Sequence, residues 1–168
     1  MSADNLIQRA VQGDKQAFAS LYTRYRDRLY RYAYFKLGSE SDAQYAVADC
    51  VVSAYQGIAS LKNETAFDAW IFRILYRSCA RQISRRAQER QNQSLDERES
   101  SLRYEQSFEA AELREALDSL SDLDRDIVLL SAVAGYNSRE IGKLTGLKPS
   151  TVRSRLSRSL AKMKEFLG

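Results

Sequence analysis

Basic side chains recur at helical spacing near the end of the chain, and guanidinium and ammonium groups are the groups with which proteins bind phosphates. Residues 139–168 contain eight Lys or Arg against two Glu, a net charge of +6. Arginine can also bind guanine or a phosphate through two parallel hydrogen bonds. This segment therefore predicts salt-sensitive binding to nucleic acid. The alternative interpretation is an ordinary solvated helix face.

The last helix is expected to begin at Pro149, because the fixed φ and missing N–H of proline suit the first helical position. One face of this helix is apolar and is expected to be buried, with Val152, Leu156, Leu160, Met163 and Leu167. The opposite side is basic and polar, with Thr151, Arg155, Arg158 and Lys162, Ser154 beside them, and Arg153 and Lys164 on a flank. Such a helix is typical of proteins that place basic side chains against DNA.

Two further helices are expected just before it. Asn137 and Glu140 have the spacing of a capping box, which would begin a helix from Ser138 to Thr145. Gly142 would allow a close helix crossing, and Gly146 suits the left-handed turn that ends a helix. An earlier apolar stripe could close a small core, with Leu120, Leu123, Ile127, Leu130 and Ala134. These elements in this order predict a helix-turn-helix.

Residue types that do covalent or acid–base chemistry are scarce. The chain has no His, which removes the commonest general base and the commonest metal ligand. It also lacks a phosphate-binding Gly loop and a nucleophile elbow. Asp122, Asp124 and Asp126 cluster where a helix is expected to start, and carboxylates there favour the helix dipole. We interpret them as helix-start charges, and we expect no enzyme activity, no cofactor and no metal.

Composition indicates the fold class and the compartment. One Pro and seven Gly in 168 residues favour an all-α protein. No apolar stretch has the length of a membrane span, and the N-terminal residues are too charged for a secretory signal. A cytoplasmic protein without membrane insertion is therefore expected. Cys50 and Cys79 have no CxxC partner, so we expect two reduced, buried thiols.

Two small helical domains are expected, at residues 1–86 and 112–168. A polar linker at residues 87–111 would join them. Apolar periodicity runs through residues 6–11, 18–37, 43–58 and 67–83, and it is lost from residue 87 to about 107. That stretch is rich in Gln, Ser and Glu, which predicts a flexible linker. Residues 87–115 hold eight acidic residues against four Arg, a net charge of −4, so the linker itself is not expected to bind DNA.

A second arginine pattern lies in the helix expected from residue 67 to 86. Four arginines recur at every fourth position and would form one ridge, namely Arg73, Arg77, Arg81 and Arg85. Trp70, Phe72 and Tyr76 would place aromatic rings close to it, while Ile71, Ile74, Leu75 and Cys79 would face the core. Arginines with aromatic rings can hold a backbone and stack on unpaired bases. In the alternative interpretation Phe67 and Trp70 are core residues and the arginines are merely solvated.

An aromatic stripe in the preceding helix is interpreted as core. Its members repeat at helical spacing, as Leu21, Tyr25, Leu29, Tyr32 and Phe35.

Three segments of the first half occur in a characteristic order, namely GDKQAFASLYTRYRDRLYRYA at residues 13–33, SESDAQYAV at 39–47 and FDAWIFRIL at 67–75. They resemble the extracytoplasmic-function group of sigma-70 family factors. In the second half, LSDLDRDIVLL, REIGKLTGL and STVRSRLSRSLAKMK are similar to region four of these factors. The resemblance covers nearly the whole chain. Its strongest part is the order of two unlike modules, since many regulators share the helix-turn-helix.

The resemblance implies three partners and a role for each module. Region two of such factors binds the clamp of core RNA polymerase and melts promoter DNA near the minus-ten element, and region four reads the minus-thirty-five element. The polymerase would be contacted by Asp42, Tyr45, Ala46, Ala48, Asp49 and Val52. The melted strand would meet Trp70, Phe72, Arg73, Tyr76, Arg77, Arg81 and Arg85. The duplex would meet Lys148, Ser150, Thr151, Arg153, Ser154, Arg155, Arg158 and Lys162. An anti-sigma factor is the third implied partner.

The chain departs from the family pattern at a few positions. Tyr45 and Ala48 stand where an acidic residue and a Gln are usual, and Arg77 and Arg81 where Asn and Asp are frequent on the minus-ten helix. Lys148 replaces the Ser that typically caps the recognition helix. Two alternative functions remain at this point. One is a stand-alone DNA-binding regulator with sigma-like architecture, and the other is an interaction protein that sequesters a regulatory partner.

Overall fold

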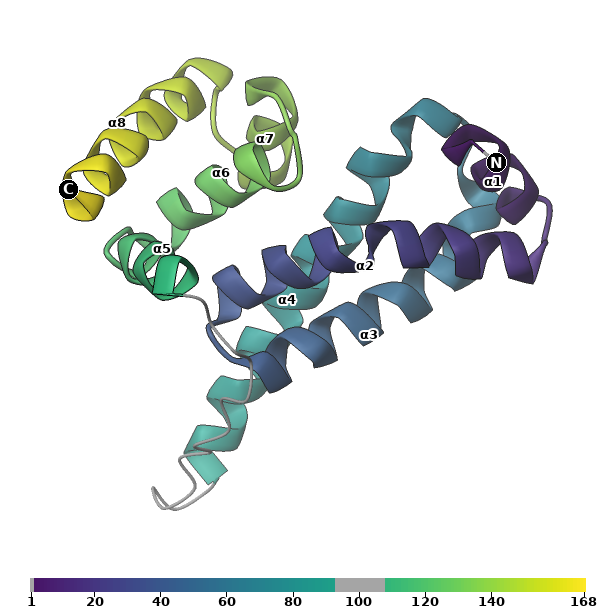
Figure 1. Ribbon diagram of the computed structural model, residues 1–168, viewed down its shortest axis with the longest axis horizontal. Helices are drawn as coiled ribbons and strands as arrows, with labels where there is room; N and C mark the ends of the chain where they lie inside the picture. Colours follow the sequence, from purple (N-terminus) through teal and green to yellow (C-terminus); the bar gives the residue numbers. More distant parts are fainter. Residues whose placement is uncertain (1, 93–107) are drawn as a thin grey trace. The chain divides into compact units, whose positions relative to one another are not determined.

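A computed structural model describes residues 2–92 and 108–168, and every regular element in these two ranges is a helix. The expected all-α fold class is therefore confirmed. The chain divides into two compact units, residues 1–101 and 102–168, whose helices can be followed in Figure 1. Each unit has its own core and is described separately.

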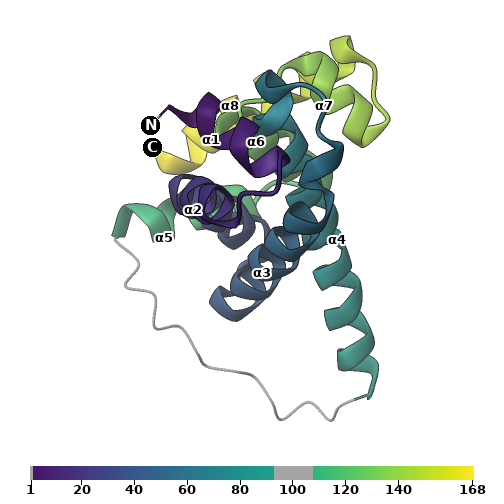
Figure 2. The same cartoon turned by 90° about the vertical axis from the view of Figure 1, so that its right-hand side faces the viewer.

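Four α-helices build the first unit. They are α1 (Ala3–Val11), α2 (Lys15–Leu37), α3 (Glu40–Gly57) and α4 (Phe67–Asn92), with short 3-10 turns at Ile58–Ser60 and Glu64–Ala66 between the last two. Helix α3 packs against both α2 and α4, and α1 packs against α2. The C-terminal turns of α4 extend beyond the ends of α2 and α3 (Figure 2).

Local capping residues set the beginnings of the helices. At five of these helices, the side-chain oxygen of the capping residue accepts a hydrogen bond from a first-turn backbone N–H. The five capping residues are Ser2, Asp14, Ser39, Ser121 and Asn137. The Ser121 hydroxyl accepts from the Asp124 N–H at 3.2 Å, and Asp122 and Asp124 lie in the first turn of their helix. The interpretation as helix-start charges is confirmed for these two residues, whereas Asp126 lies beyond the first turn and is buried.

The aromatic stripe of α2 forms the centre of the first core, as expected. Leu21, Leu29, Tyr32 and Phe35 are buried. Tyr25 is half-buried at the edge, where its hydroxyl donates to Asp68 of α4. Burial, followed by this hydrogen bond to a carboxylate, raises the pKa of Tyr25 above its ordinary value.

The second unit contains α5 (Phe108–Asp118), α6 (Asp122–Ala132), α7 (Ser138–Thr145) and α8 (Pro149–Leu167). Helices α5, α6 and α7 all pack against α8. The third expected stripe lies in this core, because Leu120, Ile127, Leu130 and Ala134 are buried and Leu123 is half-buried.

The expected linker boundaries are wrong at both ends. Helix α4 continues through residues 87–92, and α5 begins at Phe108 rather than after residue 111. Residues 87–91 are AQERQ, which are good helix formers without Gly or Pro, and the Arg86 guanidinium lies 3.6 Å from the Glu89 carboxylate one turn on. Residues 93–107, which hold most of the expected linker, lie outside the described residues.

Candidate nucleic-acid and protein interfaces

The turn between α7 and α8 is fixed by three local features. Asn137 Oδ1 accepts from the Glu140 N–H at 2.8 Å, and Glu140 Oε1 accepts from the Asn137 N–H at 3.0 Å, which completes the expected capping box. Gly146 has φ +78°, in the left-handed region. At Gly142 a Cβ atom would lie 2.6 Å from the Leu147 carbonyl oxygen. The helix-turn-helix is confirmed, and the close approach that Gly142 allows is to the backbone of the turn at Leu147.

The buried face of α8 differs from the expected one. Val152 and Met163 are buried and Leu156 is half-buried, but Leu160 and Leu167 are 47% and 46% exposed. Ser159, at 3% exposed, lies on the buried face instead. The other helices of the unit cover one narrow side of α8, and Leu160 lies about 100° around the axis from Ser159. The apolar periodicity alone thus predicted a face that is too wide.

The basic stripe expected on α8 divides into two groups. Six of the eight predicted duplex contacts are exposed, namely Lys148, Ser150, Arg153, Ser154, Arg158 and Lys162. Thr151 and Arg155 are half-buried. Arg155 Nη1 donates to Asp124 Oδ1 of α6 at 3.0 Å, and Lys162 Nζ donates to the Ser119 carbonyl at 2.8 Å. Arg155 and Lys162 therefore lean toward α6 and the end of α5.

The four arginines of α4 do not form a single ridge. Each step of four residues turns about 40° around a helix axis. Arg73, Arg77 and Arg81 are all exposed, but Arg81 also donates to Asp49 of α3 through Nε at 3.1 Å and Nη2 at 2.8 Å. The Arg85 guanidinium lies 3.8 Å from the centre of the Tyr45 ring, also on α3. The first two arginines thus face solvent and the last two bend over α3.

The aromatic residues of α4 are only partly at the surface. Phe72 is fully buried, 6.0 Å from Tyr32 between ring centres, so the expectation that it meets a melted strand is wrong. It lies about 140° around the axis from the exposed Arg77 and points into the core. Trp70 is half-buried, with its ring centre 5.8 Å from that of Phe67, and Tyr76 is half-buried. These two rings can border the surface of Arg73 and Arg77.

Helix α3 presents three of its six predicted polymerase contacts openly. Tyr45, Ala48 and Val52 are exposed. Asp42 is held by Arg86 Nε at 2.6 Å and Gln82 Nε2 at 2.9 Å, and Asp49 is paired with Arg81. Ala46 is 1% exposed, so its side chain offers almost no surface for the expected polymerase contact. Its side chain lies on the core side of α3 with Ala43 and Cys50.

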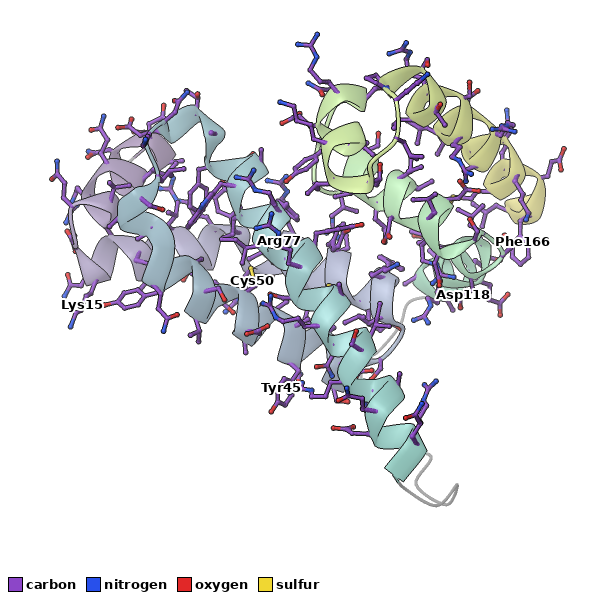
Figure 3. The ribbon with its side chains drawn as sticks, turned by 180° about the vertical axis from the view of Figure 1, so that it is seen from behind. Lys15, Tyr45, Cys50, Arg77, Asp118 and Phe166 are labelled. Atoms are coloured by element: carbon purple, nitrogen blue, oxygen red, sulfur yellow. The ribbon has the colours of Figure 1, made fainter. Side chains whose placement is uncertain are left out.

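A groove of about 830 Å³ runs between α3 and α4. Some of its lining residues were predicted to contact the polymerase, including Tyr45, Ala48, Asp49 and Val52. Two others, Arg81 and Arg85, were predicted to contact the melted strand. Sequence reasoning missed Ser41, Gln44, Ser78 and Gln82 in this lining. Gln82 had a detectable signal, since its position four residues before Arg86 places both on the side of α4 that meets Asp42. Figure 3 shows Tyr45 on α3 and Arg77 on α4, with Cys50 between the helices.

Cys50 and Cys79 are reduced, buried thiols, as expected. Burial, with a smaller effect of the Asp49 carboxylate, raises the pKa of Cys50 to about 12. No group of three or more potential metal ligands occurs in residues 2–92 and 108–168. Among the helices described here, none is long and apolar enough to span a membrane.

Comparison with known proteins decides between the possible families. The family described as "Sigma-70 region 2" matches residues 21–89, and that described as "Sigma-70, region 4" matches residues 110–163. The ECF RNA polymerase sigma factor SigM of Mycobacterium tuberculosis is 29% identical over 97% of this chain and 83% of its own length. The chain belongs to the extracytoplasmic-function group of the sigma-70 family. The ECF sigma-E factor of Haemophilus influenzae is 27% identical to this sigma factor, over 92% of this chain and 89% of its own.

Solved structures share the fold of this sigma factor. CnrH, solved in complex with the cytosolic domain of CnrY, is 26% identical and superposes with a TM-score of 0.72 over 99% of this chain and 97% of its own. RpoE of Bartonella quintana, solved with the anti-sigma factor NepR, has the same fold at 22% identity, with a TM-score of 0.72 over 89% and 96% of the two chains. Sigma factors are transcription initiation factors rather than enzymes, and this one directs RNA polymerase to promoters.

Proposed function

We propose that the two units divide promoter recognition between them. The first unit binds core RNA polymerase and the melted strand of the minus-ten element, and the second unit reads the duplex of the minus-thirty-five element. The observation that carries this proposal is that exposed arginines form separate surfaces on α4 and α8, within segments that match different sigma regions. The domain boundaries proposed are those expected from the sequence, with the helix ends moved to residues 92 and 108.

On α8, the duplex contacts proposed are the exposed residues near the start of the helix. They are Lys148, Ser150, Arg153, Ser154 and Arg158, with the half-buried Thr151 at their edge. A helix that enters the major groove contacts base edges with its N-terminal residues, so Arg153 is the proposed base-reading side chain. Arg155 and Lys162 are bound to Asp124 and the Ser119 carbonyl, which suits positioning or a phosphate contact better than base reading.

On α4, the melted strand is proposed to meet the outward face. Arg73 and Arg77 would hold the phosphates, and the half-buried rings of Trp70 and Tyr76 would border the bases. On α3, the exposed Tyr45, Ala48 and Val52 would pack against the polymerase. Asp42 and Asp49 would contribute by orienting arginines of α4.

This sigma factor is proposed to perform no catalysis of its own, since it would act by binding alone. An anti-sigma factor is a further proposed partner. The family resemblance implies such a partner. CnrH, which matches nearly the whole chain, is itself solved with a second protein, the cytosolic domain of CnrY.

The test is promoter binding and run-off transcription with purified core polymerase. Footprints at both elements are expected only with core present. Arg153→Ala should weaken duplex protection by about 1–3 kcal/mol. Arg77→Ala should leave that protection intact and slow strand opening, measured by permanganate reactivity. Arg26→Ala is a matched control, because Arg26 is an exposed arginine of α2 outside both surfaces.

Three results would contradict the proposal. Failure of the unaltered chain to direct specific initiation on any genomic fragment would remove its basis. Protection of DNA without core would favour the stand-alone regulator. Equal losses of duplex protection in Arg153→Ala and Arg77→Ala would show that the two surfaces are not specialised.

A further inference from the structure

The exposed side of α3 carries an apolar seam. Tyr45, Val52 and Tyr55 are 58%, 55% and 46% exposed, and the exposed Ala48 lies between the first two. These four positions are separated by three, four and three residues, which is the spacing of the a and d positions of a coiled coil. Large apolar side chains exposed in one line mark a docking surface, and this spacing fits a helix laid along α3.

Two cations border this seam from α4. Arg81 and Arg85 line the groove together with Tyr45, Ala48 and Val52. Nε and Nη2 of Arg81 donate to the Asp49 carboxylate, which orients the Arg81 guanidinium. The Arg85 guanidinium lies over the Tyr45 ring. Within residues 2–92, the structure gives no acceptor for Nη1 of Arg81 or for Nε and Nη1 of Arg85. Each guanidinium is therefore held in place with hydrogen-bond donors still available.

The groove has a charge preference that follows from these groups. Its lining contains two guanidinium groups and the single carboxylate of Asp49. In helix pairs, charged residues that flank an apolar seam form ion pairs with the partner and select it. A helix with apolar residues along its seam and carboxylates at its flank is complementary to this groove. A nucleic-acid strand is less suitable, because the wall opposite the arginines is the apolar seam.

We propose that Arg81 and Arg85 belong to the polymerase-docking groove and not to the DNA surface, and that they bind carboxylates on a helix of core RNA polymerase that packs along the α3 seam. This inference rests on the proposed function, since it takes the polymerase as the partner of α3. It divides the arginines of α4 by role. Arg73 and Arg77 serve the strand, and Arg81 and Arg85 serve the protein partner.

Asp49 has a defined part in this arrangement. Its carboxylate holds Arg81 at 2.8 Å, through Nε and Nη2, and leaves Nη1 for a partner carboxylate. Removal of Asp49 releases the guanidinium from this position and weakens docking. Asp49→Asn should therefore lose part of the affinity for core polymerase that Arg81 contributes.

The experiment measures the dissociation constant of the full chain for core polymerase by fluorescence anisotropy at two salt concentrations. Arg81→Gln/Arg85→Gln is expected to bind core about ten-fold or more weakly, since each arginine loses charge-assisted hydrogen bonds. Its affinity should also depend less on salt. Asp49→Asn should bind core more weakly than the unaltered chain, but less weakly than the double arginine variant. The matched control is Arg77→Gln, an exposed arginine on the same helix, which should bind core within about two-fold.

A second measurement separates the protein surface from the DNA surface. With core at saturation, a single-stranded minus-ten oligonucleotide should bind normally to the Arg81→Gln/Arg85→Gln holoenzyme and weakly to the Arg77→Gln holoenzyme. Unchanged core affinity in the double variant, or a loss confined to oligonucleotide binding, overturns the inference alone. No binding of the unaltered chain to core overturns the proposed function and this inference with it. Circular dichroism and Trp70 fluorescence would verify that each variant is folded.

Discussion

Replacement of Gly142 by Ala is expected to destabilise the second unit by displacing the turn between α7 and α8. The added Cβ would lie 2.6 Å from the Leu147 carbonyl oxygen, where ordinary van der Waals contact begins at 3.4 Å. The obstacle is backbone rather than the end of a flexible side chain. The residues between α7 and α8 would have to move. The start of α8, which is proposed to enter the major groove of DNA, would move with them.

Two opposing effects set the size of the change. Ala is favoured over Gly inside a helix by about 1 kcal/mol. Overpacking of a close contact costs about 1–3 kcal/mol, and a backbone obstacle favours the upper end of that range. The expected net loss is therefore about 1–2 kcal/mol. For a unit of this size, each kcal/mol lowers the melting midpoint by about 4–8 °C.

The assay uses two signals of the same sample. The single tryptophan, Trp70, lies in the first unit, so its fluorescence reports on that unit, whereas circular dichroism follows both. The lowered transition should appear in circular dichroism and be absent from the fluorescence. Duplex affinity should fall with it. Lys143→Gln is the control, at the exposed neighbouring position of α7. A Gly142→Ala protein as stable as the original, or more stable, would refute the reasoning about the turn.

Further predictions concern ionisable groups of the first unit. Cys50 and Cys79 are both buried, and the pKa of Cys50 is raised to about 12. Neither thiol should therefore react with a thiol reagent in the native protein at pH 8, whereas both should react in denaturant. Rapid labelling without denaturant would contradict this. Hydrogen bonds from the Ala17 N–H and then Arg9 lower the pKa of Asp14 below its ordinary value. Asp14 therefore stabilises the fold at neutral pH, and this contribution is lost as the pH falls through the lowered pKa. Asp14→Asn should flatten the acid side of the stability curve, followed by Trp70 fluorescence, and an unchanged curve would show that Asp14 does not contribute.

Local signals made much of the second unit predictable. The Asn137–Glu140 capping box, the left-handed Gly146 and the first-turn Pro149 each involve residues within a few positions of one another, so the sequence contains the whole interaction. The buried face of α8 depends instead on how much of the helix its neighbours cover. Leu160 has the right spacing for the core, but it lies beyond the side that α5, α6 and α7 enclose.

The candidate surfaces on α4 show the same limit. Spacing of four residues correctly placed neighbours such as Arg73 and Arg77 together, but the drift of about 40° per step accumulates over three steps. Arg85 therefore lies against Tyr45 and far around the helix from Arg73. Phe72 was assigned by its type, although its position relative to Leu75 and Cys79 places it among the buried residues of α4.

Arg155 provides a test of whether its ion pair with Asp124 or a contact in the DNA major groove determines its role. Its guanidinium is bound to Asp124 at 3.0 Å, and both side chains are about one-third exposed, at 35% and 27%. A pair with that exposure contributes at most about 1 kcal/mol, so a double-mutant cycle of Arg155→Ala and Asp124→Ala should give a coupling of about 0.5–1 kcal/mol in unfolding. Arg153→Ala should show no coupling to Asp124 and a larger loss of duplex affinity. The contrary result is that Arg155→Ala leaves stability unchanged and weakens duplex binding as much as Arg153→Ala does. It would show that Arg155 leaves Asp124 to contact the DNA major groove. The basic stripe expected from the sequence would then be the correct description of the DNA-bound helix.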